Sequence, residues 1–261
     1  MFRSVALAAL VAYASAQSLS TQCTNALTGI ATNPDAAACL APGSLVQIIA
    51  GGANTSIVGP INTWLTNVCS APACSNDTIS AVVQNVTTGC SNELSGLGLS
   101  SDMIPSITSL IQQYYPTARQ VICLKQGDTN CITQTLTNIQ NIVGPLSLSN
   151  LMQITSNPTI TSLPSNITCT DCVKAAYNVI NSAVPSLTSD AAPAIQSECG
   201  ASFTDGTTPS GIVDSASTST NTPGASKNAA FGTAALVSHG ALAGIAASGL
   251  VIVSSLLTML A

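Results

Sequence analysis

Ten cysteines, all lying between Cys23 and Cys199, are the feature that most constrains how this 261-residue chain can fold. An even number of cysteines is typical of an oxidising compartment, where thiols pair as structural disulfides. Charged residues make up only 6% of the sequence, against roughly 25% in an ordinary soluble domain. We therefore expect five intramolecular disulfides. They would be formed by Cys23, Cys39, Cys69, Cys74, Cys90, Cys123, Cys131, Cys169, Cys172 and Cys199.

The N-terminal segment has the three parts of a secretory signal peptide. Arg3 supplies a positive charge, residues 5–11 form a short apolar run, and Ala14-Ser15-Ala16 is a small-residue cleavage site. We expect residues 1–16 to be removed, so that the mature chain begins at Gln17. The alternative is a short buried helix of a cytosolic domain, and the cysteines downstream count against it.

The C-terminus carries a second processing signal, typical of GPI attachment. Residues 241–261 are apolar, a spacer at 231–240 precedes them, and small residues precede the spacer. We expect residues 229–261 to be exchanged for a GPI lipid on Asn228, with Gly224, Ser226 and Gly232 as the alternative sites. A retained transmembrane tail is the other interpretation, although such anchors are usually followed by Lys or Arg.

The segment between the last cysteine and Asn228 differs in composition from the rest of the mature chain. Residues 201–228 contain six Ser and six Thr, together with Gly and Pro. This composition predicts a disordered, O-glycosylated stalk that follows a cysteine-rich domain at 17–200. Within that domain, four Asn-x-Ser/Thr sequons predict N-glycosylation: Asn54, Asn76, Asn85 and Asn166.

Apolar residues recur with a helical period throughout the cysteine-rich region. The resulting stripes span residues 57–68, 79–86, 104–114, 132–143 and 173–184. Asn76 and Asp77 are candidate caps for the second stripe, and Gly144-Pro145 ends the fourth. No convincing alternation with a period of two is present, so the predicted fold class is all-α.

Two cysteine motifs bear on how this domain is organised. Cys69-x4-Cys74 and Cys169-x2-Cys172 each precede a predicted helix and a further cysteine, which leaves a diverged duplication open. The second motif could also be a redox pair or half of a zinc site. There is no second Cys-x-x-Cys and no mature histidine, so we interpret both cysteines as structural disulfides.

Composition excludes several classes of function. Removal of Arg3 leaves four basic against ten acidic side chains, with no basic cluster, which excludes nucleic-acid binding. His239 is the sole histidine and would leave with the C-terminal signal. Its loss excludes Ser-His-Asp and Cys-His catalysis and the common zinc and iron sites. We therefore expect no catalytic residue, no metal and no cofactor.

A polysaccharide-modifying enzyme of the cell wall remains the catalytic alternative, because glycoside hydrolysis uses paired carboxylates. The candidate carboxylates are Asp102, Asp128, Asp171 and Glu198. A glycosidase cleft normally also needs aromatic platforms. Outside the processing signals the aromatic residues are only Trp64, Tyr114, Tyr115, Tyr177 and Phe203. Three of them lie on or beside the helical stripes, where we expect core packing.

The sequence resembles an uncharacterised family of fungal secreted proteins with a cysteine-rich helical region, a Ser/Thr stalk and a GPI tail. Three segments carry the resemblance, which covers about residues 20–205: Leu65-Thr-Asn-Val-Cys69-Ser-Ala-Pro-Ala-Cys74, Arg119-Gln-Val-Ile-Cys123-Leu-Lys and Asn166-Ile-Thr-Cys169-Thr-Asp-Cys172. It implies a location at the cell surface or cell wall and no particular chemistry.

The order of the first six cysteines is also similar to that of the elicitins, small all-α sterol carriers. The outer spacings depart from the elicitin pattern, and four cysteines have no counterpart. This resemblance implies the pairs Cys23–Cys90, Cys39–Cys74 and Cys69–Cys123.

We thus expect a non-catalytic surface glycoprotein that meets the membrane through its GPI lipid, with wall polysaccharide or a sterol as its possible partners. For a sterol-binding module, the apolar stripes would have to line a cavity instead of filling a solid core. The lining candidates are Ile57, Ile61, Leu65, Ile79, Val83, Ile107, Ile111 and Leu136.

Overall fold

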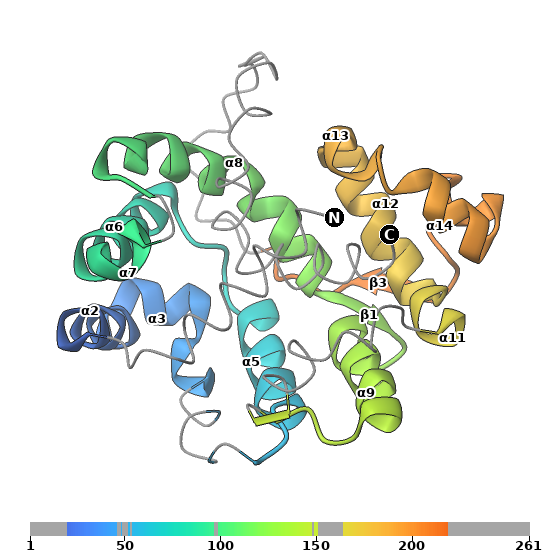
Figure 1. The fold of residues 1–261 in the computed structure, drawn as a ribbon, viewed down its shortest axis with the longest axis horizontal. Coiled ribbons are helices and arrows are strands. Elements are labelled where there is room, and N and C mark those ends of the chain that lie inside the picture. Colours follow the sequence, from blue (N-terminus) through green and yellow to red (C-terminus); the bar gives the residue numbers. More distant parts are fainter. Residues whose placement is uncertain are drawn as a thin grey trace.

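The computed structural model describes residues 20–218, apart from 46–47, 49–51, 53, 97–98, 148 and 151–163. The fold is mostly helical, as the sequence predicts (Figure 1). The signal peptide and residues 219–261, with Asn228 and its alternative GPI sites Gly224, Ser226 and Gly232, lie outside the described residues.

Five helices correspond to the five predicted stripes. They are α5 (Val58–Ser70), α6 (Asn76–Gly89), α8 (Ile104–Ile122), α9 (Cys131–Val143) and α12 (Asp171–Ala183). The third stripe underestimates its helix, because α8 continues through Pro116 to Ile122. The N-cap of α6 is Ser75 and not Asn76 or Asp77. The Ser75 hydroxyl accepts a hydrogen bond from the Thr78 backbone N–H at 3.1 Å, which leaves Asn76 as the first helical residue.

The remaining helical elements among the described residues are short, apart from the 12-residue α2. They are α2 (Thr21–Thr32), α3 (Pro34–Leu40), η1 (Pro42–Leu45), α7 (Ser91–Ser95), η2 (Ser101–Met103), α11 (Ser165–Thr168), α13 (Pro185–Thr188), α14 (Ala192–Cys199) and η3 (Ala201–Thr204). Figure 1 shows α2, α3, α6 and α7 grouped on one side and α11 to α14 on the other, with α8 running between the two groups.

A small antiparallel sheet with the order β2-β1-β3 lies beside α12. Its strands are β1 (Leu124–Gln126), β2 (Thr129–Asn130) and β3 (Ile212–Asp214). Lys125 pairs with Asn130 on one side and with Val213 on the other. Strands of two or three residues are too short to produce a period-two pattern, so they could not be predicted from the sequence.

The predicted stalk begins too early. Residues 201–218 belong to the folded domain, because Phe203 is 5% exposed, Ile212 is 9% exposed, and β3 completes the sheet. The prediction of a stalk followed from the Ser/Thr-rich composition and gave no weight to these two apolar residues. Their burial stabilises the contact of this segment with the rest of the domain.

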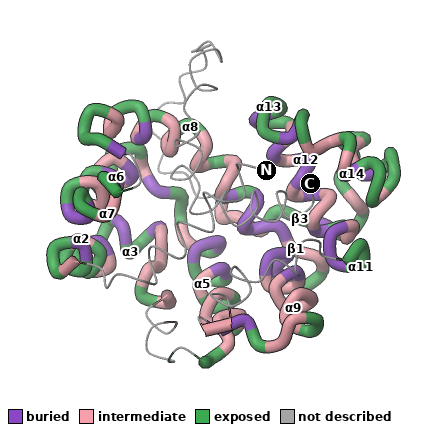
Figure 2. Tube along the Cα trace, in the orientation of Figure 1, coloured by how far each residue is buried: buried purple, intermediate pink, exposed green. Residues whose placement is uncertain are grey.

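The buried residues that form the core lie mainly on α5, α8 and α12, and on α2 and α6 (Figure 2). The close approach of α2 to α6 depends on Gly89, which is buried at the end of α6. A Cβ atom at this position would lie 2.1 Å from the Cβ of Ala26. Such a distance is far below van der Waals contact, so only glycine fits there.

Candidate functional site

All ten cysteines are paired, in five disulfides: Cys23–Cys90, Cys39–Cys74, Cys69–Cys123, Cys131–Cys172 and Cys169–Cys199. The first three are the pairs that the elicitin resemblance implies. Cys169 and Cys172 have different partners, so their Cys-x-x-Cys motif is not an internal redox pair.

The pairing does not support equivalence of the two cysteine motifs. Cys90 pairs with Cys23, ahead of the first motif, whereas Cys199 pairs with Cys169 inside the second. The bridge Cys69–Cys123 also joins the first five cysteines to the last five. The disulfide pattern therefore lacks the repeat that an internal duplication would produce.

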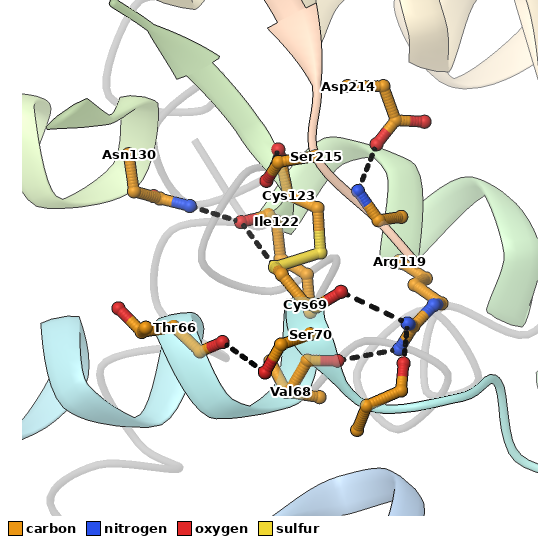
Figure 3. The surroundings of a disulfide bond; sticks show 12 residues. Thr66, Val68, Cys69, Ser70, Arg119, Ile122, Cys123, Asn130, Asp214 and Ser215 are labelled. Atoms are coloured by element: carbon orange, nitrogen blue, oxygen red, sulfur yellow. Dashed lines mark hydrogen bonds between the residues drawn. A yellow bond between two sulfur atoms is a disulfide. The ribbon is translucent and has the colours of Figure 1, made fainter. Parts of the chain in front are cut away.

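The Cys69–Cys123 disulfide lies at the centre of a buried polar network (Figure 3). The Arg119 side chain comes from α8, is 5% exposed, and donates to the carbonyl oxygens of Val68 at 2.8 Å and of Ala71. These carbonyls belong to the C-terminal end of α5, where the helix dipole favours a cation.

Asn130 ties the start of α9 to the end of α8 in the same region. Its side-chain oxygen accepts from the backbone N–H of Ile132 at 2.8 Å. Its amide donates to the carbonyl oxygen of Ile122 at 2.7 Å, as Figure 3 shows. Neither Arg119 nor Asn130 was predicted from the sequence to have this role. The only sequence signals were a basic residue five positions after the third apolar stripe and an Asn two positions before the fourth.

The C-terminal segment closes over this disulfide. Ser215 donates from its backbone N–H at 3.0 Å and from its hydroxyl at 2.7 Å to the carbonyl oxygen of Cys123. The backbone N–H of Ser217 donates to the carbonyl oxygen of Cys69 at 2.8 Å. We refer to residues 215–217 as the C-terminal strap.

All four sequon asparagines are exposed. Asn54 lies in a turn before α5, Asn76 and Asn85 lie on α6, and Asn166 lies on α11. At Asn166 the rest of the sequon is buried, because Ile167 is 1% and Thr168 2% exposed. The Thr168 hydroxyl also donates to Glu198 Oε1 at 2.7 Å, so a transferase can reach this sequon only before the chain folds.

A polar-edged groove of about 460 Å³ lies between the end of α2, the start of α3 and one face of α6. Ile30, Ala36, Ala81 and Val82 supply apolar surface, and Asn33, Asp35, Ser75, Asp77 and Thr78 supply polar groups. Asn85, one of the predicted glycan acceptors, also lines this groove.

The four candidate carboxylates are exposed and come from different parts of the fold. Asp102 lies in η2, Asp128 in the turn between β1 and β2, Asp171 at the start of α12 and Glu198 near the end of α14. Glu198 accepts from Thr168, and Asp171 from the Gln126 side chain at 3.4 Å.

Two other carboxylates are held in the ionised state by hydrogen bonds. The Thr207 hydroxyl and backbone N–H, followed by Lys174, lower the pKa of Asp205 to about 2. The backbone N–H of Ser20, which donates to Glu93 Oε1 at 2.8 Å, lowers the pKa of Glu93. Both groups fix one chain segment to another and were not singled out in the sequence.

The aromatic residues contribute to the core and do not form a sugar-binding platform. Tyr177 and Phe203 are 2% and 5% exposed, with ring centroids 6.4 Å apart. The indole of the half-buried Trp64 donates to the carbonyl oxygen of Leu40 at 2.8 Å. The Tyr115 hydroxyl accepts from the backbone N–H of Cys74 at 3.0 Å.

The predicted cavity-lining residues divide between two packed clusters. Ile79, Val83, Ile107 and Ile111 pack together with Cys39 and Cys74. Ile61, Leu65 and Leu136 pack around Cys69 and Cys123. Ile57 is half-buried and immediately precedes α5.

Within the described ranges, no group of three or more His, Cys, Asp or Glu side chains is placed to hold a metal ion. No helix in that part of the chain is both long and apolar enough to cross a membrane. Comparisons with protein-family models, with curated proteins and with solved structures found no match.

Proposed function

We propose that the chain is a non-catalytic glycoprotein of the cell surface, held at the plasma membrane or in the cell wall by a GPI lipid on Asn228. The pairing of all ten cysteines carries this proposal, because structural disulfides persist in oxidising compartments. The exposure of all four sequon asparagines also supports it, since a mature glycan needs solvent around its acceptor.

The distribution of polar and aromatic groups supports a non-catalytic role. The rings of Tyr177 and Phe203 are committed to core contacts, and the indole of Trp64 is held by the carbonyl oxygen of Leu40, so none of the three is free to act as a sugar platform. A domain built in this way would act as a rigid, stapled platform that displays glycans and keeps its shape outside the cell.

Cell fractionation tests the location. A phosphoinositide-specific phospholipase applied to intact cells, or glucanase treatment of walls, is expected to release a chain that lacks an epitope placed after residue 240. A chain that keeps this epitope and stays in the membrane through both treatments would show that the tail is a transmembrane helix.

Activity screens on glucan and chitin oligomers test the non-catalytic role. We expect no turnover above that of a heat-denatured sample. Reproducible turnover that is abolished by Asp102→Asn, Asp128→Asn, Asp171→Asn or Glu198→Gln would establish an enzyme instead.

A surface-tethered lipid- or sterol-binding module is the second candidate. The observation in its favour is the occurrence of Cys23–Cys90, Cys39–Cys74 and Cys69–Cys123, the pairs implied by the resemblance to sterol carriers. The division of the apolar stripes between two packed clusters weighs against it. Saturable binding of a fluorescent sterol, displaced by unlabelled ergosterol, would favour this candidate over the first.

A further inference from the structure

The groove between α2, α3 and α6 combines apolar and polar side chains beside a predicted glycan acceptor, Asn85. Its volume of about 460 Å³ lies within the roughly 300–1,000 Å³ of ligand pockets. Ile30 is 8% exposed and lies in its lining with Val82, while the carboxylates of Asp35 and Asp77 lie in the same lining.

We propose that this groove is occupied by the first sugars of the N-linked glycan on Asn85. The inference rests on the proposed glycoprotein function and adds a specific seat for one of its glycans. A sugar ring presents C–H groups on its faces and hydroxyl groups at its edges. The faces can cover Ala81 and Val82, which are not buried, and the hydroxyls can donate to Asp35 and Asp77.

Asn85 is the acceptor to which the geometry points, because its own side chain lines the groove. The glycan would therefore start inside its binding site. Covalent attachment gives the sugars an effective concentration in the millimolar range or above, so even weak contacts would keep them seated.

The position of the groove suggests what the seated glycan would do. The lining joins the last turn of α2 and the first turn of α3 to the face of α6 that runs from its N-cap to Asn85. A glycan in this groove would bridge these helices and would resist their separation.

The test uses the full chain secreted from a eukaryotic host, with site occupancy measured by mass spectrometry. Thr87→Val removes the Asn85 sequon but keeps Asn85 and the shape of residue 87, whereas Thr87→Ser keeps the sequon. Asn85→Gln removes the acceptor itself. Asn54→Gln is the matched control, because Asn54 is exposed and lies outside the groove.

We expect Thr87→Val and Asn85→Gln each to lower the melting temperature by about 2–4 °C, and Thr87→Ser and Asn54→Gln to change it by less than about 1 °C. The backbone amides of residues 35–40 and of the first turns of α6 should exchange with deuterium faster in Thr87→Val than in the wild type and in Thr87→Ser.

Three results would overturn the inference while leaving the glycoprotein function intact. Asn85 could lack a glycan when other sequons carry one, Thr87→Val could behave like Asn54→Gln, or added wall oligosaccharides could slow exchange in the wild-type groove. The last result would show that the groove is open to an external ligand. If none of the four sequons carries a glycan, the proposed glycoprotein function itself is wrong.

Discussion

Arg119 is a buried cation whose hydrogen bonds go to main-chain oxygens at the end of α5. Replacement by Met keeps most of the side-chain length but leaves these buried acceptors without a donor. We expect Arg119→Met to lower the free energy of unfolding by about 2–3 kcal/mol, measured by urea denaturation with the disulfides intact.

Arg119→Lys is the informative control for this prediction. Lysine keeps the positive charge but lacks the planar fork that reaches several oxygens at once, so its effect should lie between those of the wild type and Arg119→Met. If Arg119→Met is as stable as the wild type, these hydrogen bonds do not contribute to stability.

Asp205 gives the domain a specific acid sensitivity. Its pKa in the folded chain is about 2, below the usual value of 3.8. Its contribution to stability is therefore complete above about pH 4 and is lost as the pH falls through about 2. Asp205→Asn should lower the melting temperature at pH 6 and flatten its fall between pH 4 and pH 2.

The matched control is Asp102→Asn, at an exposed carboxylate of η2. Its melting profile should follow that of the wild type across the same pH range. Parallel profiles for the wild type and Asp205→Asn would contradict the role given to the Thr207 and Lys174 contacts.

At the scale of secondary-structure elements, the contact of α2 with α6 depends on the absence of a side chain at Gly89. Gly89→Ala places a methyl group against Ala26, and the two helices must separate to accept it. We expect a loss of about 1–3 kcal/mol in unfolding free energy.

The control for Gly89 is another helical glycine. A Cβ atom at Gly29 on α2 would meet nothing within 4 Å, so Gly29→Ala should stabilise the protein by about 0.5–1 kcal/mol through helix propensity. Equal effects at the two positions would show that α2 and α6 pack less closely than the structure indicates.

Strand β3 provides a second matched pair of positions. Ile212 is 9% exposed, while its neighbour Val213 is 54% exposed. Ile212→Ala should cost about 2–4 kcal/mol, and Val213→Ala about 0.5 kcal/mol or less. If both changes are neutral in urea denaturation, residues 201–218 behave as the stalk that their composition predicts.

The helices that the sequence predicts are those with long apolar stripes. The spacing of Ile132, Leu136, Ile139 and Val143 indicates a helix with one apolar face, and α9 forms there. The fold of residues 201–218 cannot be predicted from apolar stripes. Their fold depends on pairing with β1 and on cover over Cys123, both of which come from distant parts of the chain.

In the groove between α2, α3 and α6, local features were also predictable from the sequence, whereas contacts between distant segments were not. The exposed face of α6 around Asn85 was predictable from its place outside the apolar stripe. The groove beside it was not, because Asn33 and Asp35 reach α6 only through tertiary packing. The buried Arg119 has no sequence signature beyond its surroundings.

For the whole molecule, the disulfide pattern is the most direct test of the fold. Alkylation of the unreduced mature protein should add no label, and digestion should yield the five cross-linked peptides. Each bridge closes a loop of 30 to 67 residues, and its removal should cost about 2–5 kcal/mol. More than one labelled cysteine, or a different pairing, would contradict the structure.

The C-terminal strap also determines how the domain responds to mechanical load. A pull on the chain beyond residue 218 first meets the bonds of Ser217 to Cys69 and of Ser215 to Cys123. Once these bonds and the pairing of β3 with β1 break, the 15 residues between Cys199 and the strap can span about 54 Å at most. Beyond Cys199 the load passes to Cys169 and from Cys172 to Cys131, then through Cys123 to Cys69, with only short chain segments between these bridges. The domain can therefore be stretched at its edge, while covalent bonds keep its interior from being drawn out.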